Sequence, residues 1–165
     1  TGYQTEVRTV TLEPAMCLAG TPNDGELIGE VLTGAPPRNL IVAAAVSWVT
    51  SGLRGVMPAL QDLNIVVMDL GPATLGKQSG DTIYLDDDAG GYGWFIDDTP
   101  FDDSEFTRTA AGDLLAAEGS AAAGKVDLLT VLTHELGHAL GQDHSDDPTD
   151  VMFDALAVSR RLEVA

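Results

Sequence analysis

The spacing of the histidines constrains this chain more than any other feature. The chain has three histidines, His134, His138 and His144. The first two are four residues apart within a segment of helical periodicity, so their imidazoles project from the same face of one helix. Gly141 ends that helix, because a residue without Cβ can turn the chain sharply and return His144 toward the other two. The spacing therefore predicts three imidazoles that converge on one point.

Three imidazoles at one point are the donor set of a catalytic zinc ion, which takes three protein ligands and keeps a fourth position for water. Glu135 lies on the flank of the histidine face, where it suits a general base beside that water rather than a fourth ligand. A His-Glu-x-x-His pentapeptide arises by chance in many helices, but the added glycine and third histidine make the pattern specific. The alternative is a set of core or exposed histidines without a metal.

Residues 134–145 read HELGHALGQDHS and resemble the zinc-binding motif of the matrixins, the matrix-metalloproteinase family within the metzincins. Residues 150–153 resemble the Met-turn of that family, which implies that Met152 forms an apolar floor beneath the metal. The resemblance implies an α+β, zincin-like fold. This fold has a twisted mixed sheet, a backing helix, an active-site helix and a small C-terminal subdomain.

The resemblance also implies an activity, namely a zinc-dependent endopeptidase that hydrolyses peptide bonds of proteins. Its protein or peptide substrate would lie extended along an edge strand near residues 82–88. Residues 85–106 are similar to matrixin-like domains of large bacterial surface proteins, which implies a secreted or cell-surface protein, monomeric or part of a larger chain. Two alternatives stay open: a domain that processes only its own chain, and a zinc- and calcium-stabilised surface module that binds without cutting.

The length of the chain fits one domain with an N-terminal addition. Residues 1–37 are expected to form an N-terminal extension, either a pro-segment or an edge strand, with weak alternation over residues 5–12. The metallopeptidase domain is expected over residues 38–165. Gly141 would divide it into an upper part, 38–141, and a lower part that follows the turn.

Local patterns predict the main elements of this domain. Helical spacing of apolar residues predicts a helix over residues 38–53. Apolar runs predict strands over residues 64–70 and 81–87, with a loop over residues 72–80 between them. Asp127 is expected to cap the helix that carries the histidines.

An acidic stretch between residues 86 and 105 holds eight carboxylates and no basic residue. Like charges at this density favour a bound cation, and calcium, which takes six to eight oxygen ligands, is the candidate that the matrixin resemblance also implies. The alternative is a solvated acidic loop, because the spacing is not that of an EF-hand. The eight are Asp86, Asp87, Asp88, Asp97, Asp98, Asp102, Asp103 and Glu105, and all except Asp87 are taken as candidate ligands.

Cys17 is the single cysteine and cannot form an internal disulfide. Matrixin zymogens use a cysteine of an N-terminal segment to ligate the zinc, so the resemblance makes Cys17 a candidate zinc-blocking thiol. A buried or incidental thiol is the alternative. The net charge of −18 argues against nucleic acid and anionic membranes as partners. No apolar run is long enough for a membrane-spanning helix.

Overall fold

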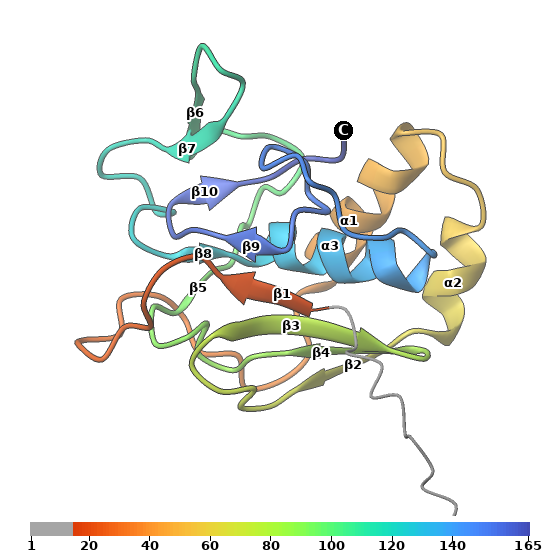
Figure 1. The fold of residues 1–165 in the computed structure, drawn as a ribbon, viewed down its shortest axis with the longest axis horizontal. Coiled ribbons are helices and arrows are strands. Elements are labelled where there is room, and N and C mark those ends of the chain that lie inside the picture. Colours follow the sequence, from red (N-terminus) through yellow and green to blue (C-terminus); the bar gives the residue numbers. More distant parts are fainter. Residues whose placement is uncertain (1–14) are drawn as a thin grey trace, which may run out of the picture.

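The computed structural model describes residues 15–165, and within them the chain forms three helices and ten short strands (Figure 1). The helices are α1 (Arg38–Thr50), α2 (Val56–Asp62) and α3 (Leu128–Ala139). The strands are β1 (Ala15–Leu18), β2 (Asn64–Val67), β3 (Thr74–Ser79), β4 (Thr82–Leu85), β5 (Trp94–Phe95), β6 (Phe106–Arg108), β7 (Leu114–Ala116), β8 (Val126–Asp127), β9 (Ala155–Leu156) and β10 (Arg160–Arg161).

The principal sheet is mixed, with strand order β2-β4-β3-β1-β9. β2 is parallel to β4 and β1 is parallel to β9, whereas the β4–β3 and β3–β1 pairs are antiparallel. α3 packs against β3 and β1, and α1 packs against α3 (Figure 1). The expected α+β class is confirmed. Among the described helices, none combines the length and apolar character needed to cross a bilayer.

Local patterns located several elements correctly. The helix expected over residues 38–53 is α1, and the strands expected over residues 64–70 and 81–87 are β2 and β4. The loop expected over residues 72–80 is wrong, because most of it is β3. This strand carries one large apolar side chain, Leu75, among polar and small residues, so it lacks the hydrophobic pattern of a strand. Backbone pairing with β4 on one side and β1 on the other holds it in the sheet.

The strand expected at the substrate-binding edge is not an edge strand. β4 lies inside the sheet, with β2 on one side and β3 on the other. Its neighbour β3 packs against α3, and the edge of β3 that faces away from β4 pairs with β1. An extended peptide therefore has no free backbone edge to meet at β4.

The boundary expected at residue 37 stays a prediction, although the segment before it contributes a strand to the sheet. β1 lies between β3 and β9, so the chain from residue 15 onward contributes to the principal sheet (Figure 1). The alternation over residues 5–12 lies outside the described residues. The part that follows Gly141 is also shared between sheets, because β9 joins β1 and β10 joins β7.

Candidate metal centre

The helix that carries the histidines starts at a side-chain cap. Asp127 accepts hydrogen bonds from the backbone N–H of Thr130 at 3.2 Å and from its hydroxyl at 2.7 Å, so the expected cap is confirmed. Residues 128–138 are buried on every side of the helix. Trp48 of α1 donates from its indole N–H to the carbonyl of Thr133 at 2.8 Å, which ties the backing helix to this one. The helix is therefore held rigidly along its length.

The chain turns sharply where α3 ends. Gly141 has φ +84°, a left-handed conformation that a side chain would disfavour. The backbone N–H groups of Gly141 and Gln142 donate to the carbonyls of His138 and Gly137 at 2.9 Å each, which closes the last turn. The turn brings His144 back to the helix, as its spacing predicts.

The three imidazoles converge. One ring nitrogen from each of His134, His138 and His144 lies within 4.8 Å of the others, and the Nε2 atoms of the first two are 3.0 Å apart. Two nitrogens that bind one zinc ion tetrahedrally at the usual Zn–N length lie roughly 3.3 Å apart. The spacing therefore fits a shared metal.

Hydrogen bonds fix which nitrogens face the centre. Nδ1 of His134 lies 2.8 Å from the carbonyl of Val151, and Nδ1 of His138 lies 2.8 Å from that of Gln142. A carbonyl accepts, so each Nδ1 carries the proton and each Nε2 keeps a lone pair for a metal. Burial lowers the pKa of His134 to about 3 and, to a smaller extent, the pKa of His138, which favours the neutral, metal-binding form. The residues present therefore fit zinc.

Glu135 is fully buried beside these rings. Its Oε1 accepts a hydrogen bond from the backbone N–H of Met16 at 3.1 Å, and its Oε2 has no partner among the described residues. Burial raises the pKa of Glu135 to about 8, against a smaller lowering by the Met16 N–H. A buried carboxylate oxygen without a hydrogen-bond partner costs folding free energy, unless a bound water or substrate supplies that hydrogen bond. Its place therefore suits proton transfer.

Two glycines allow close packing around this carboxylate and the histidines. A Cβ on Gly76 of β3 would lie 3.0 Å from both Cγ and Oε1 of Glu135. A Cβ on Gly137 would lie 2.5 Å from Sδ of Met152 and 2.6 Å from Cζ2 of Trp48. Met152, 4% exposed, therefore packs directly against the histidine helix.

Cys17 is placed apart from the histidines. Its side chain is exposed on β1. Among the described residues, the possible ligand atoms that lie together at the centre belong to the three histidines, and the thiol is not one of them. Although the residue is exposed as a whole, partial burial of its sulfur, followed by the charges of Asp154 and Glu135, raises the pKa of Cys17 and disfavours the thiolate that would bind zinc. The thiol is close enough to Glu135 for that charge to act on it, but it is not among the ligand atoms that group at the centre, so the zinc-blocking role stays a prediction.

The acidic candidates do not form one cluster. Carboxylate oxygens of Asp86, Asp87 and Asp69 lie within 4.8 Å of one another, although Asp69 precedes the acidic stretch. Asp86 also accepts from the backbone N–H groups of Leu70 and Gly90 at 2.8 and 3.0 Å, and its burial raises its pKa to about 6. Asp88, Asp97, Asp98, Asp102, Asp103 and Glu105 belong to no such set of three or more closely approaching ligand atoms among the described residues.

Two of these other carboxylates already have a cationic partner. Arg161 of β10, 4% exposed, donates to Asp97 at 2.7 Å and to Asp103 at 3.2 Å. The same guanidinium donates two hydrogen bonds of 2.9 Å to Asp127 and lies over the ring of Phe106 at 4.3 Å. It thus connects the acidic stretch to the cap of α3. The sequence reasoning did not identify Arg161 as a partner.

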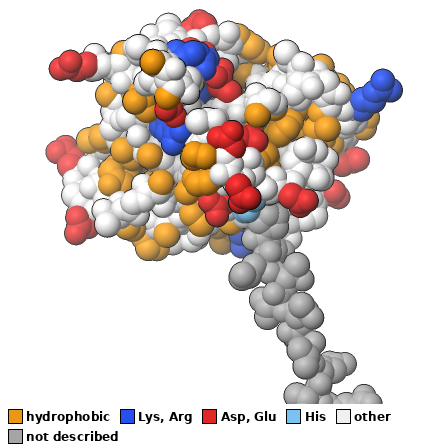
Figure 2. Space-filling model, turned by 45° about the horizontal axis from the view of Figure 1, so that its top comes forward, with side chains coloured by type: hydrophobic (Ala, Val, Ile, Leu, Met, Phe, Trp, Pro, Cys, Tyr) orange, Lys and Arg blue, Asp and Glu red, His pale blue; other side chains and the backbone are white. Residues whose placement is uncertain are grey.

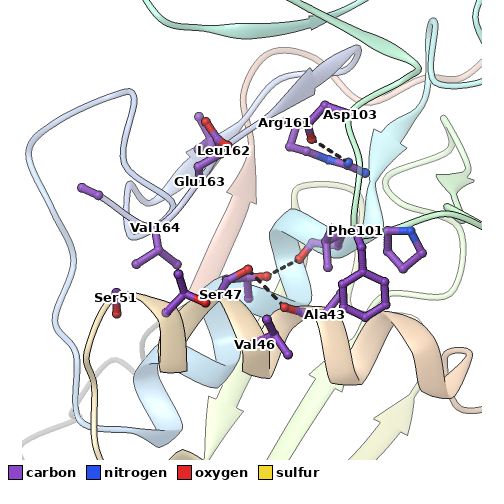
Figure 3. Close-up of a pocket in the computed structure, with 15 residues that line it drawn as sticks. Ala43, Val46, Ser47, Ser51, Phe101, Asp103, Arg161, Leu162, Glu163 and Val164 are labelled. Carbon is purple, nitrogen blue, oxygen red and sulfur yellow. Dashed lines mark hydrogen bonds and ion pairs between the residues drawn. The ribbon is translucent and has the colours of Figure 1, made fainter.

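A separate pocket lies between α1, the loop around Phe101 and the C-terminal tail (Figure 3). Its volume is about 490 Å³, and Arg161 and Val164 contribute to its tail side. Within the described residues its lining contains neither the three histidines nor Glu135. The pocket is therefore not part of the metal centre.

The view in Figure 2 shows acidic side chains spread over one face, in keeping with the net charge.

Comparison with known proteins gives one match. The family model described as Matrixin matches residues 68–164, which is more than half of the chain and includes the histidine motif and Met152. Neither the curated proteins nor the solved structures contain a significant match.

Proposed function

Because the chain belongs to the matrixin family of peptidases, we propose that it is a zinc-dependent endopeptidase that cleaves peptide bonds of proteins. One observation carries the proposal: three imidazoles bring one ring nitrogen each to one point, next along the chain to a buried carboxylate oxygen that has no hydrogen-bond partner among the described residues. His134, His138 and His144 would hold the ion. When bound there, zinc supplies Lewis acidity that acidifies water and polarises a carbonyl.

The residues of the chain perform the proton transfers. Glu135 accepts a proton from the attacking water through Oε2 and delivers it to the nitrogen of the departing amine. The hydrogen bond from Met16 to Oε1 shows that a backbone amide nitrogen can reach this carboxylate. Packing of Met152 against α3, together with the Nδ1 hydrogen bonds, keeps the imidazoles in place while the bond breaks. We propose that this arrangement is the metzincin one, with Met152 in the Met-turn.

The test uses Glu135→Gln with Glu26→Gln, an exposed position, as the matched control. Both variants should contain one zinc per chain by elemental analysis. Glu135→Gln should lose hydrolysis of a peptide library by at least about 100-fold, the usual scale for loss of a general base, and the control should retain it. Hydrolysis by Glu135→Gln at the wild-type rate would refute the assignment of the base. A folded wild type that takes up no zinc would refute the whole proposal.

We also propose a calcium ion as a structural cofactor. The support is the approach of the Asp69, Asp86 and Asp87 carboxylates in the described residues, a set of hard oxygen donors that calcium prefers. This set differs from the ligands expected from the acidic stretch, which it shares only at Asp86.

A further inference from the structure

β1 runs beside the residues proposed for catalysis. It is antiparallel to β3 and parallel to β9, the strand that follows Met152 closely in the sequence (Figure 1). It also contacts α3, the helix of the histidines. β1 is therefore a short extended segment between a sheet strand and the chain that follows the methionine, next to the metal centre.

The backbone of this segment is paired on both sides. The N–H of Cys17 donates to the carbonyl of Asp154, and the N–H of Leu18 donates to that of Ala73, each at 2.8 Å. The N–H of Ala19 donates to the carbonyl of Leu156 at 2.8 Å. Alternating main-chain bonds to two neighbours are how a peptide binds when it adds a strand to a sheet.

The side chains of the segment also alternate as those of a bound peptide would. Met16 has no exposed surface and Leu18 is 6% exposed, whereas Cys17 points outward. Met16 lies opposite Gly76, whose missing side chain leaves room for the Glu135 carboxylate. A buried apolar side chain thus follows directly after the peptide bond that meets Glu135.

The contact with Glu135 singles out one peptide bond. The Met16 nitrogen, 3.1 Å from Oε1, is the nitrogen of the Ala15–Met16 bond. In hydrolysis the general base must return its proton to the nitrogen of the bond that breaks, so it must lie within hydrogen-bond reach of that atom. Of the described residues, Met16 is the one whose amide nitrogen bonds to this carboxylate.

We propose that β1 occupies the substrate-binding cleft and that the Ala15–Met16 peptide bond is a substrate of the same chain's active site, cut within the molecule. This inference rests on the proposed peptidase function and names its substrate. Water is the co-reactant. Its oxygen forms a bond to the carbonyl carbon of Ala15 as the bond from that carbon to the Met16 nitrogen breaks. Glu135 carries the two water protons to the nitrogen in turn, so the products are a carboxylate at Ala15 and an ammonium group at Met16.

The first measurement is the intact mass and N-terminal sequence of the purified full chain, incubated with zinc. Wild type should convert to a form that starts at Met16 and release residues 1–15, whereas Glu135→Gln should stay whole. A cut at another bond, or a wild type that stays whole while it digests added peptides, would overturn the inference and leave the proposed function standing. A protein that binds zinc but cuts neither itself nor any peptide would overturn both.

A second measurement tests whether the cut occurs within the molecule. The rate should not change across a hundredfold dilution, and whole Glu135→Gln chain mixed with active enzyme should remain uncut at Ala15–Met16. Rates that rise in proportion to concentration would contradict cleavage within the molecule.

A third measurement does not depend on activity. In whole, zinc-free Glu135→Gln, hydrogen exchange should show protected amides at residues 16–19. The amides of residues 17–19 are bonded to the carbonyls of Asp154, Ala73 and Leu156, and the glutamine amide oxygen at position 135 can still accept from Met16. Fast exchange there would contradict the placement of β1. Met16→Asp should slow self-cleavage by about tenfold or more, because a buried apolar position rejects a charge. Cys17→Ser, on the exposed side of the same strand, should cleave at the wild-type rate, and equal slowing in both variants would count against the inference.

Discussion

Replacement of Arg161 by methionine should destabilise the fold more than any exposed charge change. The guanidinium is 4% exposed and bonds to Asp97 and Asp127, each 1% exposed. Burial alone would lower the pKa of Arg161, but the charges and hydrogen bonds of the two aspartates raise it above its ordinary value. Methionine fills similar volume yet leaves both carboxylates buried without a cation.

The size of the effect follows from that arrangement. Removal of one partner from a buried, hydrogen-bonded ion pair costs about 3–5 kcal/mol. For a chain of this length about 2–4 °C of melting temperature accompanies each kcal/mol, so Arg161→Met should melt roughly 6–20 °C below wild type. Because Asp127 also caps α3, the helix of the histidines should show the loss first, as faster hydrogen exchange.

The assay is urea unfolding followed by far-UV circular dichroism, with Arg108→Met as the matched control. Arg108 pairs with Glu163 at the surface, and both side chains are about half exposed, so its loss should cost at most about 1 kcal/mol. A double variant, Arg161→Met with Asp97→Asn, should recover part of the loss, because one buried charge disappears. Equal, small effects of the two arginine replacements would refute the reasoning.

Three further changes should have distinct outcomes. His144→Ala should keep the fold by circular dichroism and weaken zinc binding by more than about 100-fold in a competition titration, since one of three ligands is lost; unchanged affinity would argue against its role. Gly137→Ala should cost about 1–3 kcal/mol in urea unfolding, because its Cβ would lie 2.5 Å from Sδ of Met152, and wild-type stability would mean that the methionine moves freely. Calcium should raise the melting temperature of wild type but not of Asp69→Asn, with Asp98→Asn as the responsive control; an equal rise in all three would contradict the proposed ligands.

The metal centre could be predicted because its geometry is local. Four-residue spacing on a helix and a glycine at its end suffice to place His134, His138 and His144 together, and the structure agrees. β3 could not be predicted from its side chains, because its backbone pairs rather than an apolar pattern hold it in the sheet. β1 was missed for a related reason, since four residues carry too little periodicity to show which strands they join.

The acidic stretch shows a limit of another kind. It contains no basic residue, so a calcium ion was the expected source of neutralising charge for all of it. Part of that charge comes instead from Arg161, which is 64 positions from Asp97 and 58 from Asp103. Nothing in the local sequence indicates a partner at that distance. The residual candidate for calcium, around Asp69, includes a residue that lies outside the stretch.

Gly76 gives the sheet a direct contact with the carboxylate proposed as the general base. It lets the main chain of β3 rest against the side chain of Glu135, with no intervening methyl group. The histidines depend on α3 and its following turn, whereas the orientation of this carboxylate depends on the neighbouring strand. Under the proposed function, metal uptake and bond cleavage would depend on different parts of the fold, so a single added carbon at position 76 would leave a protein that holds zinc normally yet cannot move a proton.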